Sequence, residues 1–214
     1  MKLLFTIITL ILFNNVSFQK RENFKDKEFE GKIVYEVSIK SKTDKISTKD
    51  LKNIYGTKMT KYFKNGNFKM EYNGEQVQDI YYLKKENKEF DLRKGIDTLF
   101  ITSYSTENRK LIKSTSKESE IVILNKKCKL LIHEIGNVKN YYWYNQSLFI
   151  NPENYKDTNF SFINVYYKQT KAPWLKYKYE GENFEINYTA ISISEEKLDG
   201  KLFNLPNFPK SFIR

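Results

Sequence analysis

The residue types best suited to nucleophilic or acid–base chemistry occur once each in this chain of 214 residues, as one cysteine and one histidine. Cys128 and His133 lie in a segment whose polarity alternates, which is typical of a β-strand. Successive strand side chains point to opposite faces, so these two fall on opposite sides and a Cys–His dyad is disfavoured. His133 shares its face with Lys129 and Leu131, and no aspartate or second histidine lies nearby in the sequence. We therefore expect both residues to be structural, with Cys128 a buried thiol.

Longer catalytic signatures are absent from the sequence. It contains no G-x-S-x-G nucleophile elbow, Walker loop, G-x-G-x-x-G fingerprint or calcium-binding loop. A histidine-based zinc site is disfavoured because neither histidine nor cysteine occurs in a pair. Scattered carboxylates leave open a hydrolase that uses an acid–base pair, for which Glu30, Glu36 and Glu71 are candidates. The sequence favours a protein that is not an enzyme and that has no cofactor and no metal.

Aromatic residues are the one clear excess, with 16 tyrosines, 16 phenylalanines and 2 tryptophans. In three expected strands they alternate with polar residues, so each strand presents several of them to one face. These candidate ligand-binding residues are Phe68, Met70 and Tyr72 in 67–73, Tyr142 and Tyr144 in 140–150 (with Trp143 on the opposite face), and Leu175, Tyr177 and Tyr179 in 174–180. Two interpretations remain open: the aromatics fill the core, or they line a groove for an acyl chain or another apolar ligand.

Local signals predict the framework that would position these residues. Asn65-Gly66 between two alternating segments predicts a tight hairpin. Residues 47–56 predict a short helix that begins at Ser47, with Asp50 at the capping-box position. The alternation switches parity at Ile191, which predicts a β-bulge. Strands are expected at 33–39, 57–64, 67–73, 77–83, 89–93, 97–103, 119–124, 128–134, 140–150, 174–180 and 183–193, with an irregular, partly helical segment over 151–172.

Many short strands with little helix indicate an all-β, or β-rich α+β, protein. We expect a single domain over residues 29–214, built as a curved antiparallel sheet or half-barrel with one or two short helices. No internal repeat and no change in composition marks a second domain.

The first residues have the layout of a secretory signal peptide. Lys2 precedes an uncharged apolar run over residues 3–13, and residues 14–19 are polar. The run is shorter than the ~20 residues that a membrane-spanning helix needs. We expect a signal peptide over residues 1–19, a disordered tether over 20–28, and a mature chain without a transmembrane helix. Its compartment would be periplasmic or extracellular, in a Gram-negative bacterium, and the absence of cysteine from the signal region argues against a lipoprotein anchor.

The formal net charge of +11 gives a basic protein. Acidic residues are interleaved with the lysines, as in residues 25–28 and 84–89, and no block of Lys and Arg occurs. Nucleic acid is therefore not an expected partner.

Several segments match those of one group of exported proteins. Residues 29–35 (FEGKIVY) fit an opening strand F-x-G-x-I-x-Y, and residues 60–72 fit the following hairpin. An aromatic strand at 142–144 and a closing F-x-L-P at 203–206 complete the pattern. The chain thereby resembles uncharacterised exported proteins of Bacteroidota that share the fold of LolA, the outer-membrane lipoprotein carrier. It departs from them before Cys128, where a glycine is expected, and it lacks the signature loop of the related GLPGLI-motif proteins.

The resemblance implies an exported half-barrel and nothing specific about activity. The first functional hypothesis is an exported, non-enzymatic binding protein that holds a lipid or other apolar ligand in the concave face of the sheet. The alternative is an envelope or surface interaction protein with no small-molecule ligand, and a weaker one is a carboxylate-based hydrolase. An open apolar cavity favours the first, a filled interior the second, and two convergent carboxylates the third.

Overall fold

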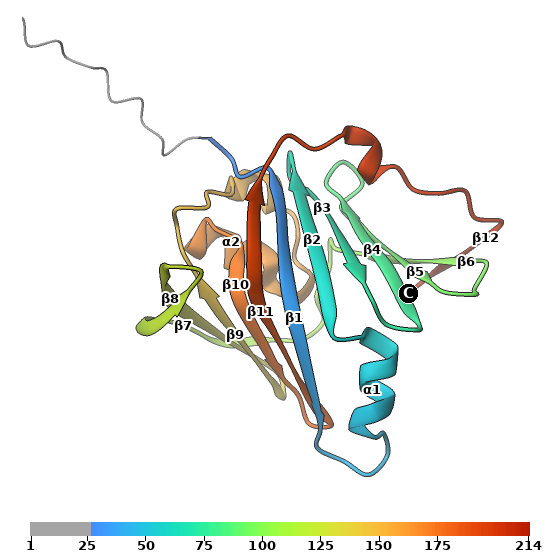
Figure 1. Cartoon of the computed structure of the whole chain (residues 1–214), viewed down its shortest axis with the longest axis horizontal. Helices are drawn as coiled ribbons and strands as arrows, with labels where there is room; N and C mark the ends of the chain where they lie inside the picture. Colours follow the sequence, from blue (N-terminus) through green and yellow to red (C-terminus); the bar gives the residue numbers. More distant parts are fainter. Residues whose placement is uncertain (1–26) are drawn as a thin grey trace, which may run out of the picture.

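The structure is a computed structural model that describes residues 27–214, and these residues build one open sheet of twelve strands (Figure 1). The strand order is β12-β6-β5-β4-β3-β2-β1-β11-β10-β9-β8-β7, and neighbours are antiparallel except for the parallel pair β12 and β6. The strands are β1 (Gly31–Ser41), β2 (Lys58–Lys64), β3 (Asn67–Tyr72), β4 (Val77–Leu83), β5 (Lys88–Arg93), β6 (Thr98–Ser103), β7 (Leu111–Ile123), β8 (Lys126–Ile135), β9 (Val138–Tyr144), β10 (Trp174–Glu180), β11 (Phe184–Glu195) and β12 (Lys210–Ile213). The predicted all-β class and half-barrel architecture are confirmed.

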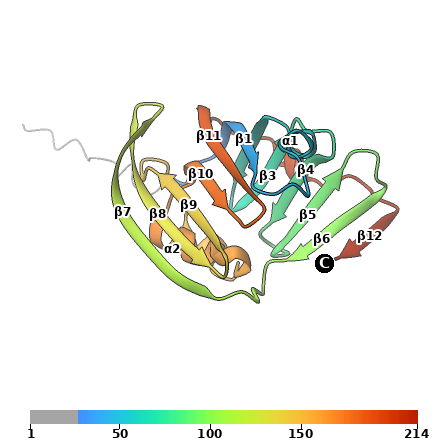
Figure 2. The ribbon, with the colours of Figure 1, turned by 90° about the horizontal axis from the view of Figure 1, so that it is seen from below.

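Figure 2 shows that the sheet curves strongly and that helix α2 (Ile163–Thr170) lies inside the curve. Two short 3-10 helices, η1 (Pro152–Tyr155) and η2 (Phe160–Phe162), precede α2 in the connection from β9 to β10. This connection is the segment for which the sequence predicted an irregular, partly helical interruption. The other helices are α1 (Thr48–Tyr55), between β1 and β2, and η3 (Gly200–Phe203), after β11.

Tyrosines of the β9–β10 connection fill much of the concave side of the sheet. Tyr155, Tyr166 and Tyr167 are all buried. Tyr155 stacks on Tyr167 with ring centroids 4.0 Å apart, and Tyr166 lies 4.6 Å from Tyr142 of β9. Stacked and tilted rings at these separations stabilise a core beyond the area that they bury. Much of the aromatic excess is therefore core.

The local signals in the sequence form the predicted structures. Asn65 and Gly66 join β2 to β3 with φ angles of 50° and 80°, the left-handed values of a tight hairpin turn. The Ser47 side chain accepts a hydrogen bond from the Asp50 amide at 3.0 Å, and the Asp50 carboxylate accepts one from the Ser47 amide at 3.4 Å. These two bonds complete the predicted capping box at the start of α1.

The predicted bulge in β11 is also present. Ala190 pairs with Tyr35 and Ser192 pairs with Val34, so Ile191 has no partner on β1. The extra residue restores the inward orientation of the alternating apolar residues on both sides of the bulge.

The convex side carries a second, smaller core cluster. Tyr81, Phe90 and Leu92 are buried there, and Leu205 and Phe208 of the segment after η3 pack against them. The last described segment therefore covers the outer face of the sheet before it adds β12 at the edge, parallel to β6.

The expected signal peptide and most of the expected tether lie outside the described residues. The tether was predicted to end at Glu28, yet the Glu28 carboxylate accepts hydrogen bonds from the Asn154 side chain at 2.6 Å and from the Asn151 amide at 3.3 Å. Within residues 27–214 no helix has the length and apolar character needed to cross a membrane.

Candidate functional site

The eight residues that the sequence nominated for ligand binding divide into two groups. Phe68, Tyr142, Tyr144 and Leu175 are buried in the main core, where a ligand does not reach them. The other four remain half-buried and pack at the margin of that core: Met70, Tyr72, Tyr177 and Tyr179. The accessible part of the concave face is thus smaller than the set of inward-facing aromatics.

Four half-buried rings follow one another along β10 and β11, and we call Trp174, Tyr177, Tyr179 and Phe184 the aromatic track. The ring centroids of Trp174 and Tyr177 lie 5.4 Å apart, and those of Tyr179 and Phe184 lie 5.3 Å apart. Tyr177 and Tyr179 occupy alternate positions of β10 and so share a face. Buried Tyr188 supports the track from β11, with its ring 5.8 Å from Tyr177 and 5.7 Å from Trp174.

Trp174 joins the track because of an irregularity that the alternation of β10 does not reveal. The register with β9 shifts between Trp174 and Lys176, so Trp174 pairs with Tyr144 while Lys176 pairs with Trp143. The shift turns Trp174 to the concave side, against Tyr35 and Tyr188. Phe184 was recognisable in the sequence, because it shares parity with Tyr188.

An open surface pocket of about 410 Å³ lies at the Phe184 end of the track. Its walls include Tyr179, Phe184 and Ile135, together with polar residues of the β8–β9 and β10–β11 turns. Its size falls within the range of ligand-binding sites in proteins. Arg109, Asn137 and Glu182 supply the polar part of the wall.

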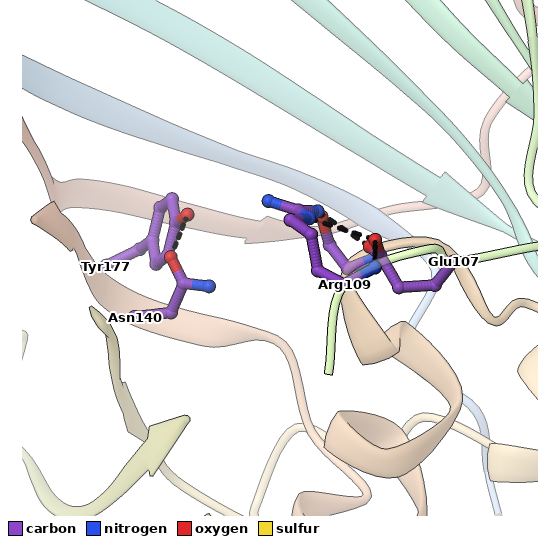
Figure 3. A network of polar contacts seen from close by, with 5 residues as sticks. Glu107, Arg109, Asn140 and Tyr177 are labelled. Atoms are coloured by element: carbon purple, nitrogen blue, oxygen red, sulfur yellow. Dashed lines mark hydrogen bonds and ion pairs between the residues drawn. The ribbon is translucent and has the colours of Figure 1, made fainter. Parts of the chain in front are cut away.

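Arg109 is fixed by a bidentate ion pair, drawn in Figure 3. Its Nε and Nη2 donate to the two Glu107 carboxylate oxygens at 2.9 and 2.6 Å, and Nη2 also donates to the Ser161 hydroxyl at 3.0 Å. The Ser161 amide donates to Glu107 at 2.7 Å. These bonds, chiefly the one from Arg109, lower the pKa of Glu107 to about 2. Arg109 is therefore a neutralised, rigid part of the wall, and it ties the β6–β7 loop to η2.

The same view shows the Tyr177 hydroxyl directed at Asn140, to whose side-chain oxygen it donates at 2.9 Å. Burial raises the pKa of Tyr177 well above its usual value, so the hydroxyl stays neutral. Asn140 is buried on β9, opposite His133 of β8. This hydrogen bond holds the ring of Tyr177 in place on the track.

Lys61 of β2 lies at the Trp174 end of the track. Its ammonium lies over Phe68 at 4.1 Å, Phe63 at 5.1 Å and Trp174 at 5.3 Å from the ring centroids. The side chain is buried, with 6% of the residue exposed. Burial lowers the pKa of Lys61 to about 7, and the charge of Glu89 opposes that shift.

Glu89 of β5 is the acidic residue whose charge acts on Lys61, and Asp91 lies two positions further along the same strand. Tyr104 donates its hydroxyl hydrogen to Glu89, whose pKa burial raises. Asp91 binds Arg93 at 3.2 Å and Arg214 at 2.9 Å. Two guanidinium groups thus neutralise Asp91. This arrangement is typical of a structural ion pair and differs from the two carboxyl groups of an acid–base catalyst.

The carboxylates and the histidine that the sequence singled out do not line the track. Glu30 pairs with Lys64, Glu71 pairs with Lys69, and Glu36 is exposed. His133 is fully buried with its ring 5.5 Å from that of Tyr142, and burial lowers its pKa to about 4. Cys128 is buried as well. None of these groups approaches the arrangement of a nucleophile with its base.

Comparison with known proteins does not place the chain in a family. No family model matches the chain, and no curated protein matches it. Among solved structures, PNGF-II is similar over 87% of this chain, at 13% identity and a TM-score of 0.43, and this chain spans 31% of the PNGF-II chain. An uncharacterized conserved protein from Thermus thermophilus is similar over 86% of this chain and 91% of its own, at 8% identity and a TM-score of 0.42.

Proposed function

We propose that this protein is a non-enzymatic binding protein that holds an elongated, mostly apolar ligand along the aromatic track. The observation that carries the proposal is that Trp174, Tyr177, Tyr179 and Phe184 form one line of half-buried rings on the concave face. The line ends at an open pocket of about 410 Å³. Rings that are rigidly packed on one side and wet on the other are suited to contact with an amphiphile.

The expected affinity follows from the apolar surface that a chain-like ligand would bury. Each methylene removed from water contributes about 0.8 kcal/mol. A chain of about ten such groups therefore reaches roughly micromolar affinity after the cost of association. The track is one sheet face rather than a closed tunnel, so the ligand lies against it and keeps one side near solvent.

Export belongs to the same proposal. Its support is the sequence layout of residues 1–19, a positive residue followed by an apolar run and a polar end. An exported protein with an accessible apolar face would act as a carrier or receptor of amphiphiles.

The alternative function, an interaction protein without a small-molecule ligand, is favoured by one specific observation. Tyr155, Tyr166 and Tyr167 fill much of the concave side that an enclosed ligand would otherwise occupy. In that case the track is the contact surface for another protein. The two functions differ in whether the purified protein binds a free amphiphile.

The chain offers a sharp test because it has 2 tryptophans. Trp174 is on the track, whereas Trp143 lies on the opposite face beside Tyr141. A W143F variant leaves Trp174 as the only tryptophan, whose emission we expect to shift on titration with a fatty acid. In a fluorescent fatty-acid assay, W174A should weaken binding by about tenfold or more, and W143A by less than about twofold.

The assay is run on protein purified without detergent, with solvent extraction and mass spectrometry to identify any bound lipid. If no lipid is extracted and the probe fails to bind at tens of micromolar, the ligand-binding function is wrong and the interaction function takes its place.

A further inference from the structure

Lys61 is the one buried ion whose charge the described residues leave without a partner. The other buried charged side chains are paired: Lys69 with Glu71 at 2.7 Å and Asp79 at 3.4 Å, and Asp91 with two arginines. Between residues 27 and 214, no carboxylate lies within 4.0 Å of the Lys61 ammonium. An unpaired buried charge is strongly disfavoured, and burial lowers the pKa of Lys61 accordingly, so a lysine at this buried position calls for an explanation.

The rings around Lys61 offset part of this cost but do not replace a counter-ion. Phe63, Phe68 and Trp174 surround the ammonium at cation–π distances. Glu89 is the acidic group that acts on Lys61, yet it forms no ion pair with the ammonium, and one of its carboxylate oxygens accepts a hydrogen bond from the Tyr104 hydroxyl. The site therefore has a cation, an apolar wall and, among the described residues, no carboxylate paired with that cation.

The aromatic track leads to the Lys61 ammonium. Trp174 belongs to both features, because its ring lies 5.4 Å from Tyr177 on the track and 5.3 Å from the Lys61 ammonium. Met70 faces Lys61 across the β2–β3 ladder, and both Met70 and Trp174 keep accessible surface. A chain that lies along the track thus ends beside the ammonium.

We propose that Lys61 binds the carboxylate of an acyl ligand whose chain lies on the aromatic track. This inference rests on the proposed function and names its ligand class, a monocarboxylic amphiphile. A single cation suits a monoanion, whereas a phosphate dianion would leave one charge unpaired and would face stronger repulsion from Glu89 than a monoanion does. The ion pair is formed in an apolar surrounding, where charge-assisted hydrogen bonds are strong.

Binding through Lys61 has a characteristic pH dependence. The carboxylate requires the ammonium form, and the free protein holds that group with a pKa of about 7. Affinity should therefore fall as pH rises above 7, by up to about tenfold per unit. The ionisable group that faces Lys61 is Glu89 of β5, which is hydrogen-bonded to Tyr104 just after β6. Asp91 and Arg214 act in turn on the charge of Glu89. Burial raises the pKa of Tyr104 well above its usual value, so this tyrosine stays neutral between pH 6 and 9.

The experiment compares dodecanoic acid with its methyl ester, by calorimetric titration of the full mature chain. The variants are K61M, K61R and K176M. Lys176 is the matched control, because its ammonium lies 5.0 Å over Trp143 on the opposite face. We expect the wild type and K176M to prefer the acid by about tenfold or more, and K61M to bind acid and ester equally. K61R should also prefer the acid, and its preference should persist between pH 7 and 9, where that of the wild type declines, because arginine stays charged.

Thermal unfolding controls for folding, and K61M should be as stable as the wild type or more so, because it removes a buried charge. If acid and ester bind the wild type equally, or if K61M keeps the preference, the head-group assignment is overturned while the track function stands. If neither compound binds any folded variant, both proposals are overturned.

Discussion

Tyr35 donates its hydroxyl hydrogen to the backbone carbonyl of Trp174 at 2.8 Å, and the two rings lie 4.3 Å apart. This contact joins the fully buried β1 residue to the first ring of the track. The position of Trp174 is therefore set from beneath by the core, as well as by the register shift in β10.

The first prediction concerns this contact. Tyr35→Phe keeps the ring and removes the hydrogen bond, so we expect a loss of about 1–2 kcal/mol in the free energy of unfolding. In the W143F background, Trp174 emission should also shift. Urea denaturation and fluorescence spectra check both. Tyr62→Phe is the control, since its bond to Glu71 is partly exposed. An unchanged Trp174 spectrum in the folded Tyr35 variant would contradict the positioning role.

The second prediction concerns His133. Its folded pKa is lowered from 6.5 to about 4 by burial. The unfolded chain binds the proton more readily, so folding stability is complete above pH 6.5 and is lost as pH falls toward 4. The shift corresponds to about 3 kcal/mol.

His133→Leu removes this titration. We expect the variant to be at least as stable as the wild type at pH 7, because the ring nitrogens have no hydrogen-bond partner among residues 27–214. The difference between the two proteins in denaturation from pH 7 to pH 4 isolates His133 from the carboxylates, which both share. Parallel pH profiles would show that His133 is not the group responsible.

The third prediction concerns Glu107 and Arg109. The Arg109 side chain is 42% exposed and that of Glu107 is 6% exposed, so the pair is partly screened. We expect a coupling energy of about 1–2 kcal/mol from the cycle of Glu107→Gln, Arg109→Ala and the double variant. Because the pKa of Glu107 is lowered in the folded protein, the stabilisation from this ion pair is complete at pH values above the ordinary glutamate pKa. It is lost as the pH falls toward 2. A coupling near zero at pH 7 would mean that the loop is held by other contacts.

The fourth prediction separates two effects of glycine. Gly66 has a φ of 80°, and an added Cβ would come within 2.8 Å of both the Asn154 Cβ and the Lys84 Cδ. Gly95 has a φ of 71° with nothing within 4 Å. Gly95→Ala should cost about 1 kcal/mol from backbone strain alone, and Gly66→Ala clearly more. Equal losses in urea denaturation would show that Asn154 and Lys84 move aside freely.

Local chemistry made much of this fold predictable. The capping box at Ser47, the turn at Asn65-Gly66 and the bulge at Ile191 depend on neighbours in the sequence, and all three are present. The alternation of apolar and polar residues located the core strands, because it too depends only on neighbouring residues in the sequence. Contacts between distant segments were not predictable in this way, and β7 extends over Leu111–Ile123 where only residues 119–124 were expected.

The candidate site shows the same division. Tyr177 and Tyr179 were nominated by alternation, but Trp174 reaches the track through a register shift against β9, a partner that the sequence of β10 does not identify. Lys61 was missed because lysine ordinarily marks a solvated position. Only the approach of Phe68 and Trp174 from other strands makes its surroundings apolar.

The central place of β1 in the strand order has a kinetic consequence. β1 pairs with β2, its near neighbour, and also with β11, so that Ile33 is matched with Ile193. Hairpins such as β2–β3 close early because their loops are short, whereas the two flanks of the sheet join only when β1 finds β11. We therefore expect the β1–β11 seam to limit the refolding rate. Substitutions in the seam should slow folding, and so should those in the β2–β3 turn, because that hairpin is already formed when β1 meets β11.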